Sequence, residues 1–115
     1  MDVKKMGEDL EIEEEEMLNL LKTFVETSAS DLVCLEAAIE EQNPDQAVAS
    51  AHSIKGAAAL LGLTEICEVA KKTELDARKN NLKGGFEAVR IMREKLDQIA
   101  KEVGNKDKPL GSLRT

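Results

Sequence analysis

Aromatic residues are almost absent from this sequence of 115 residues: tryptophan and tyrosine do not occur, and the two phenylalanines are Phe24 and Phe86. A hydrophobic core must therefore be built from leucine, isoleucine, valine, alanine and methionine. Such a composition favours helices, because strands prefer β-branched and aromatic residues. The length suits a single domain of ordinary size.

Other scarcities exclude several classes of function. No apolar run approaches the roughly 18 residues of a membrane span, and the N-terminus leads into acidic residues rather than the apolar stretch of a signal peptide. The formal net charge of −7 argues against nucleic-acid binding, because a phosphate backbone needs a basic face. Cys34 and Cys67 are too few for a disulfide framework or a zinc site. We interpret them as reduced packing residues of a cytoplasmic protein.

The apolar spacing predicts two helices in the first half of the chain. The first covers about residues 12–41 and begins with acidic residues, which complement the positive end of a helix dipole. Asn43 is a good N-cap and Pro44 a good first helical residue. We therefore expect a second helix over 44–61, closed by Gly62.

Two further helices are predicted in the second half. The third has Thr64 as its cap and runs to about residue 80. The fourth begins near residues 83–85 and is stopped by Gly104. Its apolar seam consists of Phe86, Val89, Met92, Leu96, Ile99 and Val103.

Together these helices predict an all-α fold, an antiparallel up-down four-helix bundle, over residues 12–104. Residues 1–11 are expected to form a flexible N-terminal segment and residues 105–115 a flexible C-terminal tail. The predicted core stripe of the second helix is Ala47, Ala51, Ile54, Ala58 and Leu61.

The most informative residue is the single histidine, His52. At roughly 100° per residue it points about 200° away from Ile54 and the core stripe. Lys55 lies one helical turn further along, and Gly56 stands where a larger side chain would crowd the imidazole. Glycine costs about 1 kcal/mol relative to alanine within a helix. Its presence therefore indicates that something must approach closely.

The other side chains on this face are small. We interpret Val48, Ala49 and Ala59 as candidate contacts for a docking partner. A lone histidine is often a core or surface residue without chemistry. The helical phase argues against the core, whereas a plain surface role stays open but does not explain Gly56.

Several kinds of site fit poorly. A metal site in a helical bundle needs paired ligands on facing helices, and the chain has no second histidine. Nothing marks Ser50 or Ser53 as a strained nucleophile beside an oxyanion hole, and no glycine-rich loop precedes a helix to hold a nucleotide phosphate. What remains is an exposed histidine nucleophile. A phosphoryl group on it would be stabilised by the ammonium one turn away.

The segment Ala51-His52-Ser53-Ile54-Lys55-Gly56 resembles the His-x-x-Lys-Gly motif of histidine-containing phosphotransfer (HPt) domains. It is most similar to the version in the N-terminal phosphotransfer domain of chemotaxis histidine kinases. The similarity continues through Leu61-Gly62-Leu63 and Glu74-Leu75-Asp76-Ala77-Arg78.

The resemblance implies a role for each residue at the site. His52 would be phosphorylated, Lys55 would stabilise the phosphoryl group, and Gly56 would provide clearance. Glu74 would orient the imidazole through a hydrogen bond; the alternative is a solvent-facing glutamate. Those kinases can carry a second histidine one turn before the glutamate, and here that position holds Lys71, which would supply a second positive charge or simply be solvated.

The function implied is that of a cytoplasmic phosphorelay carrier in two-component signalling. Such a carrier is not an enzyme, because its partners supply the catalysis. A histidine kinase brings ATP, and a response-regulator receiver domain brings an aspartate and Mg²⁺. We expect a monomer that binds no cofactor itself and has no nucleic-acid or membrane partner.

Two alternatives stay open. The chain is a phosphotransfer domain cut from a larger chemotaxis-type kinase, or it is a helical adaptor bundle that is never phosphorylated. Met1 and the compact size favour a standalone protein over a fragment, whereas the closeness of the motif favours the kinase.

Overall fold

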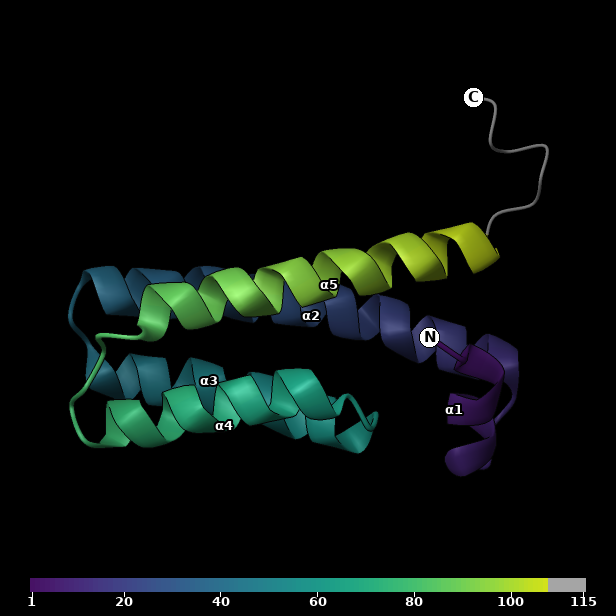
Figure 1. Ribbon diagram of the computed structural model, residues 1–115, viewed down its shortest axis with the longest axis horizontal. Helices are drawn as coiled ribbons and strands as arrows, with labels where there is room; N and C mark the ends of the chain where they lie inside the picture. Colours follow the sequence, from purple (N-terminus) through teal and green to yellow (C-terminus); the bar gives the residue numbers. More distant parts are fainter. Residues whose placement is uncertain (108–115) are drawn as a thin grey trace, which may run out of the picture.

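The computed structural model describes residues 1–107, and this part of the chain is all-helical, as predicted. It contains five helices rather than four (Figure 1). They are α1 (Val3–Asp9), α2 (Glu14–Glu40), α3 (Pro44–Leu60), α4 (Thr64–Arg78) and α5 (Gly85–Asp107).

The four long helices lie side by side, and the chain reverses direction at each link between them (Figure 1). Helix α2 packs against α3 and α5, and α4 also packs against α3 and α5. The packing between α3 and α4 is the most extensive in the described chain. Side chains on these two helices are therefore held in a fixed relation to each other.

The ends of α3 follow the predicted signals. The Asn43 side chain accepts a hydrogen bond from the backbone N–H of Gln46 at 3.2 Å, and Pro44 is the first helical residue. After the helix, Gly62 has a φ of +74°, a conformation that costs glycine little. The prediction that Thr64 caps α4 was wrong by one position: Leu63 is the N-cap and Thr64 is the first helical residue.

The N-terminal segment differs most from expectation. Residues 1–11 were predicted to be flexible, but they contain α1, which packs against α2. Val3 is only 1% exposed. The terminal ammonium of Met1 pairs with Glu102 of α5 at 3.0 Å. A helix of seven residues is too short to show a convincing apolar period, so the sequence pattern missed it.

Helix α5 differs from its prediction at both ends. It continues past Gly104 to Asp107, because a single interior glycine weakens a helix by only about 1 kcal/mol. Residues 105–107 of the predicted tail are thus helical, and residues 108–115 lie outside the described part. At the other end Phe86 is half-exposed rather than in the seam. Gly85 takes the buried place, where a Cβ would lie 2.5 Å from Ile39 Cδ1.

The core lies between the long helices and contains the rest of the predicted seam of α5. All five predicted stripe residues of α3 are also buried: Ala47, Ala51, Ile54, Ala58 and Leu61. Cys67 is half-buried against the core, but Cys34 is exposed and is therefore not a packing residue. Within residues 1–107, no helix has the length and apolar character needed to cross a membrane.

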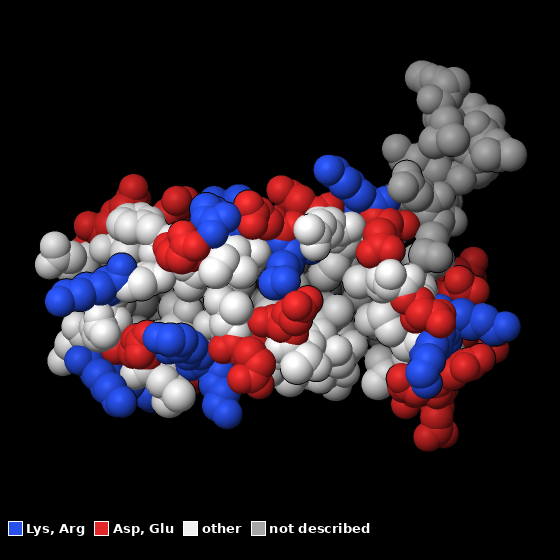
Figure 2. Space-filling model, in the orientation of Figure 1, with Lys and Arg blue, Asp and Glu red and all other residues white. Residues whose placement is uncertain are grey.

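Charge is unevenly distributed on the face that Figure 2 shows. Acidic side chains are densest around α1, with basic side chains among them, and the surface over α4 and α5 also carries both signs. On this face the described residues form no continuous basic surface of the kind that nucleic acids require.

Candidate functional site

The imidazole of His52 lies on the outer face of α3, as the helical phase predicted. Its side chain is 62% exposed, whereas Ile54, two residues on, is 1% exposed. Two concavities of the described chain, one of about 450 Å³ between α1, α5 and the α3–α4 link and one of about 500 Å³ beside Phe86, are lined by other residues. The histidine is therefore presented on an open surface.

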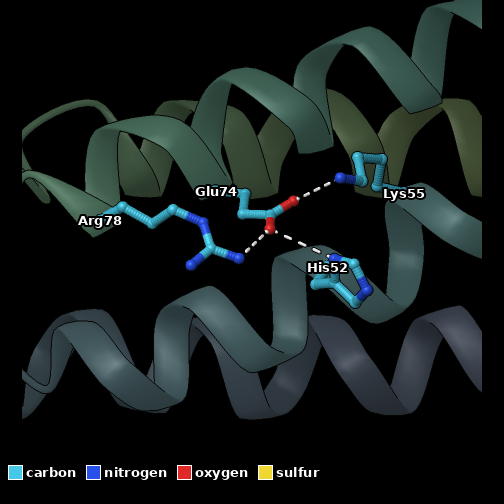
Figure 3. A network of polar contacts seen from close by, with 4 residues as sticks. All are labelled: His52, Lys55, Glu74 and Arg78. Carbon is cyan, nitrogen blue, oxygen red and sulfur yellow. Dashed lines mark hydrogen bonds and ion pairs between the residues drawn. The ribbon is translucent and has the colours of Figure 1, made fainter.

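A carboxylate from the neighbouring helix holds one nitrogen of the ring. Nδ1 of His52 lies 3.2 Å from Oε2 of Glu74 on α4. The other ring nitrogen points away from Glu74 (Figure 3). Because a carboxylate can only accept, Nδ1 carries the proton and Nε2 keeps a free lone pair. Glu74 therefore makes the contact through which it was expected to orient the imidazole. The alternative, a glutamate that faces solvent, is wrong because Glu74 is buried.

The same carboxylate pairs with two cations. Lys55 Nζ lies 2.8 Å from Oε1, and Arg78 Nη2 donates to Oε2 at 2.7 Å. These contacts lower the pKa of Glu74 to about 2, with Lys55 as the largest cause, while burial opposes the shift. Glu74 is thus an anion throughout the physiological range, and it can stabilise positive charge on the imidazole.

Three of the four residues predicted to line a docking surface are exposed. Ala49, Gly56 and Ala59 are exposed on α3, whereas Val48 is half-buried against the core. A Cβ added at Gly56 would meet nothing within 4 Å. The fold itself therefore does not require glycine at this position.

Lys71 is exposed on α4 and forms no ion pair or hydrogen bond with any described side chain. It lies one turn before Glu74, on the same side of the helix. The structure therefore leaves its positive charge in solvent and does not bring it into the contacts of His52.

Two features of the site were missed from the sequence. The resemblance includes Arg78 but implies no role for it, although its spacing of four from Glu74 is that of a helical ion pair. Ser53, beside the histidine, donates a hydrogen bond to Asp31 Oδ2 of α2 at 2.7 Å. No sequence spacing signals this second contact, because the partners are 22 residues apart.

Within residues 1–107 no group of three or more His, Cys, Asp or Glu side chains is arranged to hold a metal ion. The chemistry available at the described site is therefore that of one imidazole, one carboxylate and two cations.

The fold and the site define a helical module that presents one histidine to solvent. The family model of the Hpt domain matches residues 19–102. The chain therefore belongs to the Hpt domain family, and it is a histidine phosphotransfer carrier of two-component phosphorelay. Hpt domains in general interact with histidine kinases and response regulators.

A solved structure has the same fold as this chain. It is histidine-containing phosphotransfer protein B (HptB) from Pseudomonas aeruginosa PAO1, which aligns with a TM-score of 0.77 at 24% sequence identity. The alignment covers 90% of this chain and 88% of that chain. At this identity the likeness concerns the fold. No match is found among curated proteins.

Proposed function

We propose that His52 is the phosphorylated residue and that Nε2 is the atom that takes the phosphoryl group. The observation that carries the proposal is the contact of 3.2 Å between Nδ1 and Glu74 Oε2. The contact supports a proton on Nδ1, which leaves the lone pair on Nε2, the ring nitrogen that points away from Glu74 (Figure 3). An imidazole in this state is a competent nucleophile.

The transfer step follows from this tautomer. The Nε2 lone pair attacks phosphorus, an N–P bond forms, and the bond from phosphorus to the donor oxygen breaks. That oxygen leaves with its electron pair, on an aspartyl carboxylate or on ADP. The ring keeps its Nδ1 proton and gains positive charge, which the Glu74 carboxylate stabilises. Transfer to a receiver aspartate is the reverse of this step.

The partners provide what this chain lacks. A histidine kinase supplies ATP, and a response-regulator receiver domain supplies the acceptor aspartate and Mg²⁺. We propose that the chain is a phosphocarrier without catalytic activity of its own. The exposed Ala49, Gly56 and Ala59, with Val48 at their edge, form the surface on which the partner docks. Their small size lets the partner's active site approach the imidazole closely.

The proposal extends to the support of α3 and to the setting in which the protein works. The four long helices act as an antiparallel four-helix bundle that serves as a rigid support for α3. The protein works in the cytoplasm as a monomer and has neither nucleic-acid nor membrane partners. No cofactor is bound by the chain itself.

Labelling tests the proposal directly. Incubation with a phosphorylated receiver domain or an autophosphorylating histidine kinase should label the wild type and leave His52→Gln unlabelled. Circular dichroism should show that both proteins are folded. Equal labelling of the two proteins would show that another residue is the acceptor. Partner binding without any phosphohistidine would support a helical adaptor instead.

A further inference from the structure

In the unphosphorylated structure the Lys55 ammonium is paired with the Glu74 carboxylate. The inference rests on the proposed function, in which His52 is phosphorylated, and on the sequence argument that the Lys55 ammonium, one helical turn away, stabilises the phosphoryl group. In the structure its Nζ instead lies 2.8 Å from Glu74 Oε1 (Figure 3). For Lys55 to turn its ammonium fully to a phosphoryl group on His52, its contact with this carboxylate must weaken or break.

Leaving Glu74 unpaired would be strongly unfavourable. Its side chain is only 5% exposed, and a buried carboxylate that loses its partners is destabilised by desolvation. An unpaired Glu74 would also be free to change its rotamer and to lose its contact with Nδ1 of His52. The departure of Lys55 therefore needs a second cation that stays behind.

Arg78 is in the position to be that cation. Its Nη2 donates to Glu74 Oε2 at 2.7 Å, which is the same oxygen that faces His52. Lys55 pairs with the other oxygen, Oε1, which is buried and has no hydrogen bond of regular geometry. The two cations thus hold different oxygens, and the contact of Lys55 is the one that can be broken without disturbing the side that faces the imidazole.

We propose that Arg78 is a positioning residue that keeps Glu74 paired and directed at His52 while Lys55 turns from Glu74 to the phosphoryl group. The phosphoryl group then faces Lys55, the ring faces Glu74, and Glu74 remains neutralised by Arg78. Positive and negative charges alternate through the site in the phosphorylated state.

The alternative is that Arg78 forms an ordinary surface ion pair with no effect on Lys55. Helix α4 contains a matched control for this alternative. Lys72 and Asp76 have the same spacing of four residues and a comparable distance of 2.8 Å, but both are more solvated than Glu74. Exposed pairs of this kind contribute little. Removal of Lys72 should therefore leave the site unchanged.

The experiment uses the full chain phosphorylated with potassium phosphoramidate. In that reaction an N–P bond to His52 forms while the P–N bond of phosphoramidate breaks, and its nitrogen leaves as ammonia. The pH titration of the phosphoryl group is followed by ³¹P NMR in the wild type, Lys55→Gln, Arg78→Gln, the double variant, Arg78→Lys and Lys72→Gln. An ammonium beside the phosphoryl group favours its doubly charged form and so lowers the midpoint of the titration.

The inference predicts a specific pattern of midpoints. Lys55→Gln should raise the midpoint, and Arg78→Gln should raise it by the same amount, because Lys55 then stays on Glu74. The double variant should show no further rise. Arg78→Lys should return the midpoint to the wild-type value, and Lys72→Gln should not move it. Before phosphorylation, ¹H–¹⁵N spectra should show the Nδ1-protonated ring in both Arg78→Gln and the wild type.

Two results would overturn the inference, and they are distinguishable. If the phosphohistidine forms but Arg78→Gln has the wild-type midpoint, or if the two shifts simply add, Arg78 does not release Lys55. If wild type and His52→Gln give the same phosphorylation pattern, the proposed function fails and the inference fails with it.

Discussion

Oε2 of Glu74 accepts contacts from two sides: Nδ1 of His52 at 3.2 Å and Nη2 of Arg78 at 2.7 Å. His52 and Glu74 are 22 residues apart and come from different helices. Their contact depends on the close packing of α3 against α4. It fixes the tautomer of the imidazole, and so it determines which nitrogen is available as a nucleophile.

Replacement of this carboxylate should slow the chemistry without unfolding the protein. We expect Glu74→Gln to reduce the rate of His52 phosphorylation by about 10- to 100-fold, because the neutral amide neither fixes the tautomer nor stabilises charge on the ring. Single-turnover labelling measures the rate. A wild-type rate in a folded Glu74→Gln protein would remove Glu74 from the mechanism.

The same variant should reveal a pH-dependent contribution to stability. The pKa of Glu74 is lowered from 4.5 to about 2, so its ion pairs stabilise the folded state fully above pH 4.5 and lose this effect as pH falls toward 2. We expect wild type to exceed Glu74→Gln in free energy of unfolding by about 3 kcal/mol at pH 7. In urea titrations this difference should shrink below pH 4.5; a difference that stays constant down to pH 2.5 would contradict it.

Gly56 provides a test in which stability and function should change in opposite directions. Gly56→Ala should raise the free energy of unfolding by about 0.5–1 kcal/mol, because the added Cβ meets nothing within 4 Å and alanine is the better helix former. Phosphotransfer with a receiver domain should nevertheless slow, because the methyl group intrudes on the docking surface.

Gly104→Ala is the matched control for this substitution. Gly104 is also helical with open space at its Cβ, and it lies on α5, which does not contact α3. We expect the same gain in stability with unchanged transfer. Equal transfer rates in Gly56→Ala and the wild type would refute the clearance argument.

The buried stripe of α3 should tolerate no charge. Ile54 is 1% exposed within the core, and Ile54→Asp would bury an unpaired carboxylate. We expect loss of the helical circular dichroism signal or a molten state at pH 7. A cooperative thermal transition at the wild-type temperature would show that the phase assigned to α3 is incorrect.

Helix α1 should contribute stability but not chemistry. Val3 is 1% exposed, so Val3→Ala should lower the free energy of unfolding by about 2 kcal/mol. Phosphotransfer should be unaffected at temperatures where the variant is folded, because α1 packs against α2 and not against α3 or α4. An unchanged urea midpoint would mean that α1 is not docked in solution.

The sequence by itself determined the class of fold, the outward direction of His52 and the motif with Lys55 and Gly56. These features follow from short-range periodicity: one helix fixes the angle between His52 and Ile54 whatever surrounds it. The docking of α1 and the exposure of Phe86 could not be read in this way. A seven-residue helix carries too little periodic signal, and Gly85 takes the place of Phe86 because α5 approaches Ile39.

Only the tertiary structure decided how the single histidine is used. The spacing around His52 cannot show that Glu74 is buried, that Lys55 is paired with it, or that Arg78 holds the oxygen facing the imidazole. These facts depend on the rotation and offset of α4 relative to α3, which are set by how their side chains interlock in the core. A one-dimensional pattern fixes the direction of each side chain about its own axis, whereas contacts between helices require the packing itself.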